Sequence, residues 1–277
     1  MSPSIEDLSE LPGHLVLVGA GTMGGALLEG WQRLGLAPAQ IAVIEPTPSP
    51  QIAALVNRGV RLNPDARALT DVAAIVIAVK PQIAPQVLPV VAPMIGKSTV
   101  VVSIMAGRTL RSLANALPGA SAIVRAMPNL PASIGRGITV AVPWRPDNAQ
   151  RALTDRLLSA TGKVAWVDDE GLLDAVTAVS GSGPAYVFLL AEALAEAGAA
   201  SGLPRALAVE LARETVAGAG ALLHDSQLDA AALREAVTSP GGTTAAALEV
   251  LMGTDGLVQL LTKAVAAATA RSRKLAE

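Results

Sequence analysis

The sequence predicts an α/β protein in which a doubly wound sheet is followed by an all-helical C-terminal domain. Three observations support this prediction. Short apolar segments alternate with helical ones in the first half, a glycine-rich turn follows the first of these segments, and β-branched runs nearly vanish beyond Asp168. The boundary is expected near Val167–Gly171, which gives one domain over residues 1–167 and another over 168–277.

Composition limits the possible classes of function. The chain has 277 residues, enough for two ordinary domains, and 51% of them are hydrophobic while 2% are aromatic, so Ala, Val and Leu must fill the cores. A net charge of -2 with no Lys/Arg cluster predicts no nucleic-acid partner. The chain has no cysteine, and His14 and His224 form no ligand pattern, so we expect no disulfide and no metal site.

The mean hydropathy of +0.47 raises the question of a membrane span. The most apolar stretches, Val72–Val79 and Val87–Ile95, are short or interrupted by proline. Neither reaches the roughly 18 to 20 apolar residues that a span requires. The N-terminus is acidic and polar, unlike a signal peptide. We therefore expect a cytoplasmic enzyme with no membrane partner.

Strands and helices alternate in the first half. The expected strands are His14–Val18, Ile41–Ile44, Ala74–Val79, Val100–Ile104, Ala122–Ala126 and Ile138–Val142. The expected helices are Met23–Leu34, Gln51–Arg58 and Pro85–Met94. The strands are apolar throughout, as in a parallel sheet covered on both faces.

Long segments rich in Ala, Leu and Glu follow. They predict helices at Leu172–Val179, Ala185–Ala200, Arg205–Leu223, Ala230–Val237, Thr244–Met252 and Leu257–Leu275. Breaks are expected at residues 181–184, 202–204, 224–227 and 240–242, where Gly, Pro, His or Ser interrupt the pattern.

The turn Gly19-Ala-Gly21-Thr22-Met23-Gly24 follows the first strand and opens a helix. In a dinucleotide loop the first glycine permits the turn, the second lets the backbone approach the pyrophosphate, and the third lets helix and strand pack closely. The helix N-terminus then presents N–H groups to the phosphates. In this context the motif predicts a Rossmann-type, dinucleotide-binding N-terminal domain.

Glu45 ends the second strand, about 20 residues after the glycine turn, where an acidic residue can accept hydrogen bonds from the adenosine ribose. Such a carboxylate favours NAD, whereas NADP needs positive charge or several donors for its 2′-phosphate. Thr47 and Ser49 offer hydroxyls nearby, and Arg58 and Arg61 are the first bases that follow in sequence. A solvated loop residue is the alternative interpretation, so the choice between NADPH and NADH stays open.

The distribution of lysines bears on the reaction. The five lysines are Lys80, Lys97, Lys163, Lys263 and Lys274, so none lies between residues 164 and 262. A hydroxy-acid dehydrogenase must remove an alcohol proton and needs a base of this kind in its helical domain. Reduction of a C=N bond requires less, because a protonated imine accepts hydride once it is positioned.

Two segments have the composition of carboxylate-binding turns. Residues 180–186 and 238–244 each place glycines, hydroxyls and bare N–H groups where a helix begins. Helix capping is the alternative interpretation. The paired Gly241 and Gly242 after Pro240 exceed what capping requires, which favours binding.

Together these motifs resemble the pyrroline-5-carboxylate reductase family. The segment from Leu233 to Leu248, with its Ser-Pro-Gly-Gly-Thr-Thr core, resembles the family signature almost position for position. The resemblance runs from about residue 13 to 275 and includes further matches in family order, at Gly19–Gly24, Ala78–Gln82, Ser103–Gly107, Arg125–Pro131 and Ser180–Tyr186. It departs at Leu130, where the family commonly has Thr.

The resemblance implies a set of residues around the cofactor. Gly19, Gly21, Thr22, Met23 and Gly24 would hold the pyrophosphate, while Ala78, Val79, Lys80 and Pro81 would lie beside the ribose and nicotinamide. Met127 and Asn129, with Pro128, would line the nicotinamide side. Lys80 would also favour an anionic substrate, with a structural lysine as the alternative.

It also implies how the substrate, a cyclic imine, is bound. Ser239 and the backbone of Gly242 and Thr243 would bind the carboxylate of 1-pyrroline-5-carboxylate, and Thr244 would hydrogen-bond the ring nitrogen. Orientation is the role expected of Thr244, because an unperturbed hydroxyl is a poor acid. The product would be L-proline.

Family members pair through their helical domains, so the resemblance implies a homodimer or a ring of dimers. Two other functions compete with this interpretation. A β-hydroxyacid dehydrogenase shares the glycine loop but needs the missing lysine. A catalytically silent dinucleotide-binding protein would not need the intact residues from Ser239 to Thr244.

Overall fold

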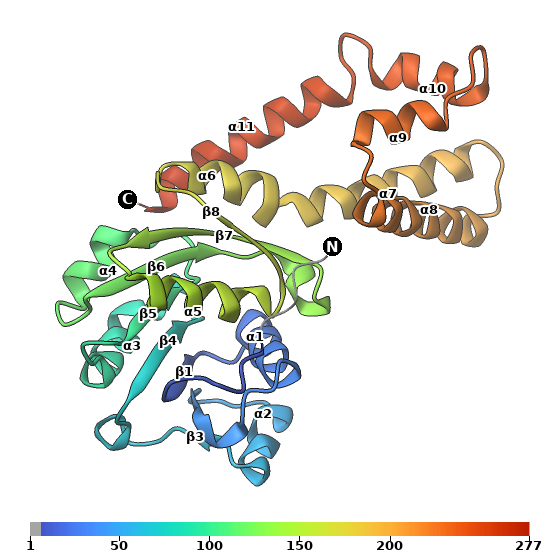
Figure 1. The fold of residues 1–277 in the computed structure, drawn as a ribbon. Coiled ribbons are helices and arrows are strands. Elements are labelled where there is room, and N and C mark those ends of the chain that lie inside the picture. Colours follow the sequence, from blue (N-terminus) through green and yellow to red (C-terminus); the bar gives the residue numbers. More distant parts are fainter. Residues whose placement is uncertain (1–6, 277) are drawn as a thin grey trace. The chain divides into compact units, whose positions relative to one another are not determined.

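The computed structural model describes residues 7–276, which form two compact units. The first unit comprises the chain up to Gly181 together with the C-terminal segment from Thr269 onwards, and the second comprises Ser182–Ala268. The sheet lies in the first unit and the second is built of helices (Figure 1). The predicted fold class is therefore confirmed.

The first unit contains an eight-stranded sheet in the order β3-β2-β1-β4-β5-β6-β7-β8. Its strands are β1 (His14–Val18), β2 (Ile41–Ile44), β3 (Arg61–Leu62), β4 (Val72–Ile77), β5 (Val100–Ser103), β6 (Ala122–Met127), β7 (Gly137–Trp144) and β8 (Gly162–Trp166). The strand order reverses between β1 and β4, so the carboxyl ends of these two strands form the switch point where dinucleotide folds bind ligands.

Helices cover both faces of the sheet, which makes it doubly wound (Figure 1). One face packs against α1 (Thr22–Arg33), α2 (Pro50–Ala54) and α5 (Asn148–Ser159), and the other against α3 (Ala84–Val91), α4 (Leu110–Ala116) and α6 (Leu172–Val176). On the first face Trp31 is fully buried, and its indole N–H donates to the carbonyl of Leu157 at 2.8 Å. This bond joins α1, which follows the glycine turn, to α5.

The parallel alternation predicted for the first half ends at β6. β7 runs antiparallel to β6, with Ile123 opposite Trp144 and Met127 opposite Val140. The connection between these strands holds only the short helix η6 (Leu130–Ile134), and a parallel return needs a crossover of a dozen or more residues. β8 then pairs parallel to β7 at the edge.

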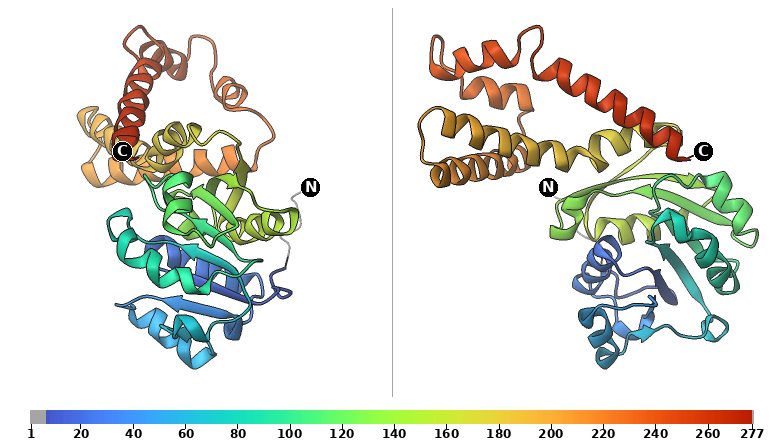
Figure 2. Two further views of the ribbon diagram at one scale, coloured as in Figure 1. Left: turned by 90° about the vertical axis from the view of Figure 1, so that its left-hand side faces the viewer. Right: turned by 180° about the vertical axis from the view of Figure 1, so that it is seen from behind.

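The second unit contains α7 (Gly183–Ala200), α8 (Arg205–Asp225), α9 (Ala230–Ala236), α10 (Thr243–Leu251) and most of α11 (Leu257–Ala276). α7 and α8 lie side by side in an antiparallel hairpin (Figure 2). The turn is closed by the Leu203 N–H, which donates to the Gly198 carbonyl at 3.1 Å. Gly198 also permits the close approach, since a Cβ there would lie 3.3 Å from that of Ala208.

The predicted boundary after residue 167 differs from the division by contacts, which falls after Gly181. α6 stays with the sheet because Leu173 is buried in its core. The end of α11 returns to the same unit, where the Ser272 hydroxyl donates to Asp174 at 2.7 Å. Which residues form the functional domains remains a prediction.

One apolar helical segment is longer than the helices expected from the sequence. Within residues 7–276, the segment Leu172–Ala200 forms a helix of 29 residues whose mean hydropathy reaches 1.3, long and apolar enough to cross a membrane by length and composition alone. The expected break at residues 181–184 corresponds to a bend at Ser182, where the π-helix η7 (Thr177–Gly181) ends and α7 begins. A single helix of this kind is weak evidence for a span.

Candidate active site

The glycine turn joins β1 to α1 in a conformation that side chains would prevent. Gly19 has a φ of +90°, and a Cβ on it would lie 2.7 Å from both the carbonyl oxygen of Ala78 and Cγ1 of Val79. A Cβ on Gly24 would collide with the carbonyl oxygen of Gly19. The turn therefore packs directly against the segment that follows β4.

The N-terminus of α1 is open. Gly21 is its N-cap and supplies no side-chain cap, while a Cβ built on Gly21 would meet nothing within 4 Å. The first N–H groups of a helix lack intrahelical acceptors and attract anions. A hollow of about 520 Å³ lies beside this end, lined by Ala20, Gly21, Thr22, Gly25, Ala26, Glu29, Ser49, Gln51, Ile52 and Ser133. These features fit a dinucleotide pyrophosphate.

The segment after β4 lies beside the glycine turn. The Ala78 N–H donates to the carbonyl of Val18 at 2.7 Å, while Lys80 is exposed at the same edge of the sheet. Pro81 is held from the far side, because the Arg108 guanidinium donates to its carbonyl at 3.1 Å. Arg108 was not predicted, although it directly follows the Ser103–Gly107 segment.

Glu45 makes more contacts than the sequence suggested. It is half-buried at the end of β2, and its carboxylate accepts hydrogen bonds from the Ala20 N–H at 3.0 Å and the Thr47 N–H at 3.1 Å. Asn63 bonds to its backbone on both sides, accepting from the Glu45 N–H at 2.8 Å and donating to the Glu45 carbonyl at 2.9 Å. Glu45 is therefore hydrogen-bonded to the glycine turn from a partly exposed position.

Met127 and Asn129 lie at the end of β6. The Asn129 side-chain oxygen accepts from the Ile138 N–H at 3.0 Å, which fixes the start of β7 and leaves its amide N–H groups available to a ligand. Met127 contacts the end of the π-helix, since a Cβ on Gly181 would lie 2.8 Å from its methyl group. The neighbouring Ser180 hydroxyl is buried with no partner among residues 7–276.

An ion pair anchors β6 beneath this site. Arg125 is buried, with 7% of its surface exposed, and its guanidinium lies 2.7 Å from the Glu170 carboxylate. The same Glu170 oxygen accepts from the Leu110 N–H at 2.8 Å, at the start of α4. The ion pair thereby connects β6, α4 and the loop before α6. The Arg125–Pro131 motif did not predict this connection, and Glu170 belongs to none of the motifs.

The predicted substrate residues all lie in the second unit, around the start of α10. The turn is closed by the Gly242 N–H, which donates to the Ser239 carbonyl at 3.0 Å, and Gly242 caps α10 without a side chain. Within residues 7–276, the hydroxyls of Ser239 and Thr244 have no hydrogen-bond partner. Because the Gly242 N–H is already bonded, the first free donors of the helix are the N–H groups of Thr243 and Thr244.

Comparison with known proteins identifies the family. Residues 170–275 match the family described as pyrroline-5-carboxylate reductase dimerisation. A curated pyrroline-5-carboxylate reductase from Synechocystis is 40% identical over 265 residues, covering 95% of this chain and 98% of the relative. This chain belongs to the pyrroline-5-carboxylate reductase family.

Solved structures of a pyrroline-5-carboxylate reductase and of a pyrroline carboxylate reductase match almost the whole chain. One from Coxiella burnetii has a TM-score of 0.88 at 33% identity and covers 96% of this chain and 99% of its own. One from Plasmodium falciparum, solved with NADP bound, has a TM-score of 0.77 at 28% identity and covers 95% and 98%. Residues 14–107 also match a family described as NADP oxidoreductase, coenzyme F420-dependent.

Proposed function

We propose that this protein reduces the C=N bond of 1-pyrroline-5-carboxylate to give L-proline, using NADH or NADPH. The observation that carries the proposal is that its likeness to pyrroline-5-carboxylate reductases covers 95% of the chain, and so includes both the glycine turn and the Ser239–Thr244 turn. The nicotinamide would supply the hydride, and the chain would bind and orient both reactants.

The cofactor would be bound by the first unit. The open α1 N-terminus after Gly21 fits the pyrophosphate, with Gly19, Thr22, Met23 and Gly24 shaping the turn. The segment from Ala78 and Val79 to Pro81 would lie towards the nicotinamide, because it follows β4 at the switch point of the sheet. Met127 and the amide of Asn129, at the end of β6, would complete this side.

The substrate would be bound by the turn before α10. Its carboxylate would accept hydrogen bonds from the Ser239 hydroxyl and the Thr243 N–H, with a further contact at Gly242 if the Gly242 N–H shares its bond to Ser239. The partial positive charge at the start of α10 also favours an anion. A carboxylate held by several donors fixes the ring beside it, and fixing the ring supplies most of the catalysis.

Thr244 and Lys80 would have separate roles, one in orienting the imine and one in attracting the substrate. The Thr244 hydroxyl would hydrogen-bond the ring nitrogen and orient the imine. Lys80, exposed after β4, would attract the anionic substrate without exchanging a proton with it. This division of roles needs no strong base, in keeping with the lack of lysine between residues 164 and 262.

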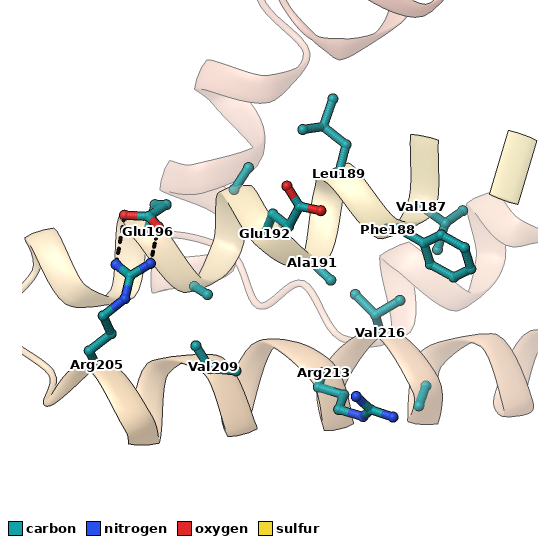
Figure 3. Close-up of a pocket in the computed structure, with 13 residues that line it drawn as sticks. Val187, Phe188, Leu189, Ala191, Glu192, Glu196, Arg205, Val209, Arg213 and Val216 are labelled. Carbon is teal, nitrogen blue, oxygen red and sulfur yellow. Dashed lines mark hydrogen bonds and ion pairs between the residues drawn. The ribbon is translucent and has the colours of Figure 1, made fainter. Parts of the chain in front are cut away.

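We also propose that two copies pair through the helical unit, either as a dimer or within a ring of dimers. A groove of about 780 Å³ lies between α7 and α8, and its walls include Val187, Phe188, Val209 and Val216 (Figure 3). Phe188 is 55% and Val209 48% exposed in the single chain, so the groove leaves apolar side chains open to solvent, as interaction sites do. A second copy would cover this face, and a cytoplasmic location remains a prediction from the sequence.

The activity can be tested by following oxidation of NADH and of NADPH at 340 nm with and without pyrroline-5-carboxylate. We expect oxidation that depends on the imine and yields proline. Binding of either cofactor without turnover would support the silent dinucleotide-binding alternative. Turnover with a β-hydroxy acid and none with the imine would replace the proposal with a dehydrogenase.

A further inference from the structure

We propose that Glu45 is a specificity-determining residue that makes this enzyme select NADH over NADPH. The inference rests on the proposed function, because it takes a nicotinamide dinucleotide as the ligand of the glycine turn. The NADP bound in the Plasmodium falciparum structure belongs to a chain only 28% identical to this one, so it does not decide the preference here.

The Glu45 carboxylate occupies the donors that a phosphate would need. Its two oxygens accept from the Ala20 N–H at 3.0 Å and the Thr47 N–H at 3.1 Å, so it joins the glycine turn to the loop after β2. Backbone N–H groups of this kind bind the oxygens of anions. Here the protein's own carboxylate takes that place. A 2′-phosphate would meet a negative charge and two donors already in use.

A strained residue fixes the backbone that carries this carboxylate. Asn63 has a φ of +47°, a left-handed conformation that costs backbone energy, although asparagine tolerates it better than most residues. In this conformation its side chain bonds to both the N–H and the carbonyl of Glu45. Asn63 is therefore a positioning residue, and the loop has little freedom to move Glu45 aside for a phosphate.

The hollow itself offers no compensating cation among the residues that line it. The hollow beside the glycine turn includes Glu29 and no Lys or Arg among its lining residues. Arg61 pairs with Ala42, three residues before Glu45, which is about 10 Å back along the strand. Arg58 lies at the same far end, because a Cβ on the adjacent Gly59 would lie 3.8 Å from the N atom of Ala39.

NADH suits this arrangement because its ribose carries two hydroxyl groups. A carboxylate offers about four lone-pair positions, of which the two backbone N–H groups use two. The remaining positions can accept hydrogen bonds from the 2′- and 3′-hydroxyls. The same charge that binds the diol would repel a phosphate at the 2′ position. The Glu45 side chain would therefore both strengthen NADH binding and weaken NADPH binding.

The test is calorimetric titration of the intact protein with NADH and with NADPH, without imine, at one fixed salt concentration. We expect NADH to bind at least about tenfold more tightly. In Glu45→Gln the charge is lost and the amide can donate to phosphate, so this ratio should fall at least about tenfold. Asn63→Ala should also lower the ratio while leaving the charge in place. Glu10→Gln, an exposed carboxylate before β1, is the matched control and should leave it unchanged.

The outcomes separate the two proposals. NADPH binding as tightly as NADH in the unaltered protein, or a ratio unchanged by Glu45→Gln, would overturn the role of Glu45 and leave the reductase intact. Failure to bind either cofactor would overturn both. The ratio of NADH to NADPH affinity is measured on the unaltered protein. The inference can therefore be refuted even if a variant does not fold.

Discussion

Thr244 is the residue on which the substrate's orientation is proposed to depend. Its hydroxyl has no partner within residues 7–276, so replacing it should leave the turn's own hydrogen bonds in place. We expect Thr244→Ala to lower kcat/KM for the imine about tenfold to a hundredfold, because a hydrogen bond to a charged group is lost. Steady-state kinetics with the imine would measure this.

Two further variants separate orientation from stability. Thr244→Ser keeps the hydroxyl and should recover most of the activity. Thr262→Ala removes an exposed hydroxyl on α11 that donates only to the Val258 carbonyl, and it should leave the kinetics unchanged. Thr244→Ala with unaltered kcat and KM would remove Thr244 from the mechanism.

The sequence revealed the side chains at the cofactor end better than their partners. Spacing alone pointed to Glu45, but not to its bonds with the Ala20 and Thr47 N–H groups. These contacts bring together loops far apart in the chain, and no local pattern encodes them. Asn63 carried a weak signal, since an Asn-Pro pair favours a turn, yet its partner depends on the pairing of β3 with β2.

At the scale of elements, the link between β6 and the loop before α6 depends on Arg125 and Glu170. We expect Glu170→Gln to reduce the free energy of unfolding by about 2 to 3 kcal/mol, because it leaves the buried guanidinium without its counter-charge. Urea unfolding would measure the change. Glu235→Gln, whose partner Arg234 is also exposed, should change stability by less than about 0.5 kcal/mol. Equal effects of both variants would show that burial adds nothing to the first pair.

Several elements were predictable from local pattern and others were not. β1 and β2 were predicted to the residue, because buried parallel strands are apolar throughout. α5 was missed although Asp147 and Gln150 form a capping box at its start, and β8 was missed because its Lys163 and partly buried residues break the apolar run. The reversal at β7 follows from a short connection, which pattern alone does not weigh.

At the scale of the whole molecule, the helical unit leaves many apolar side chains of α7 and α8 exposed in the single chain. Only Ala195 of α7, and only Ala208 and Ala212 of α8, are buried among the described residues of these helices. The division of the protein into a sheet and a helical half was predictable from composition. The covering partner was not, because apolar helices of a core and of an interface have the same pattern.

The pairing of two copies can be tested at the α7–α8 groove. Val209→Glu places a charge on an apolar surface that is 48% exposed in the single chain, so it should spare the fold of the chain and disrupt the interface. We expect light scattering at micromolar concentration to show a dimer or larger assembly for the unaltered protein and a monomer for this variant. Val56→Glu, at an equally exposed valine of the first unit, is the matched control and should keep the full mass. The Glu196–Arg205 ion pair at one end of the groove makes the stability of the α7–α8 hairpin depend on pH. The reason is that the Arg205 guanidinium, by hydrogen bonding and by its charge, lowers the pKa of the Glu196 carboxylate. Its contribution, small for an exposed pair, is present above the ordinary pKa of Glu and is lost as the pH falls through the lowered value. A monomeric mass for the unaltered protein would overturn the proposed pairing, and an unchanged mass for Val209→Glu would place the interface elsewhere.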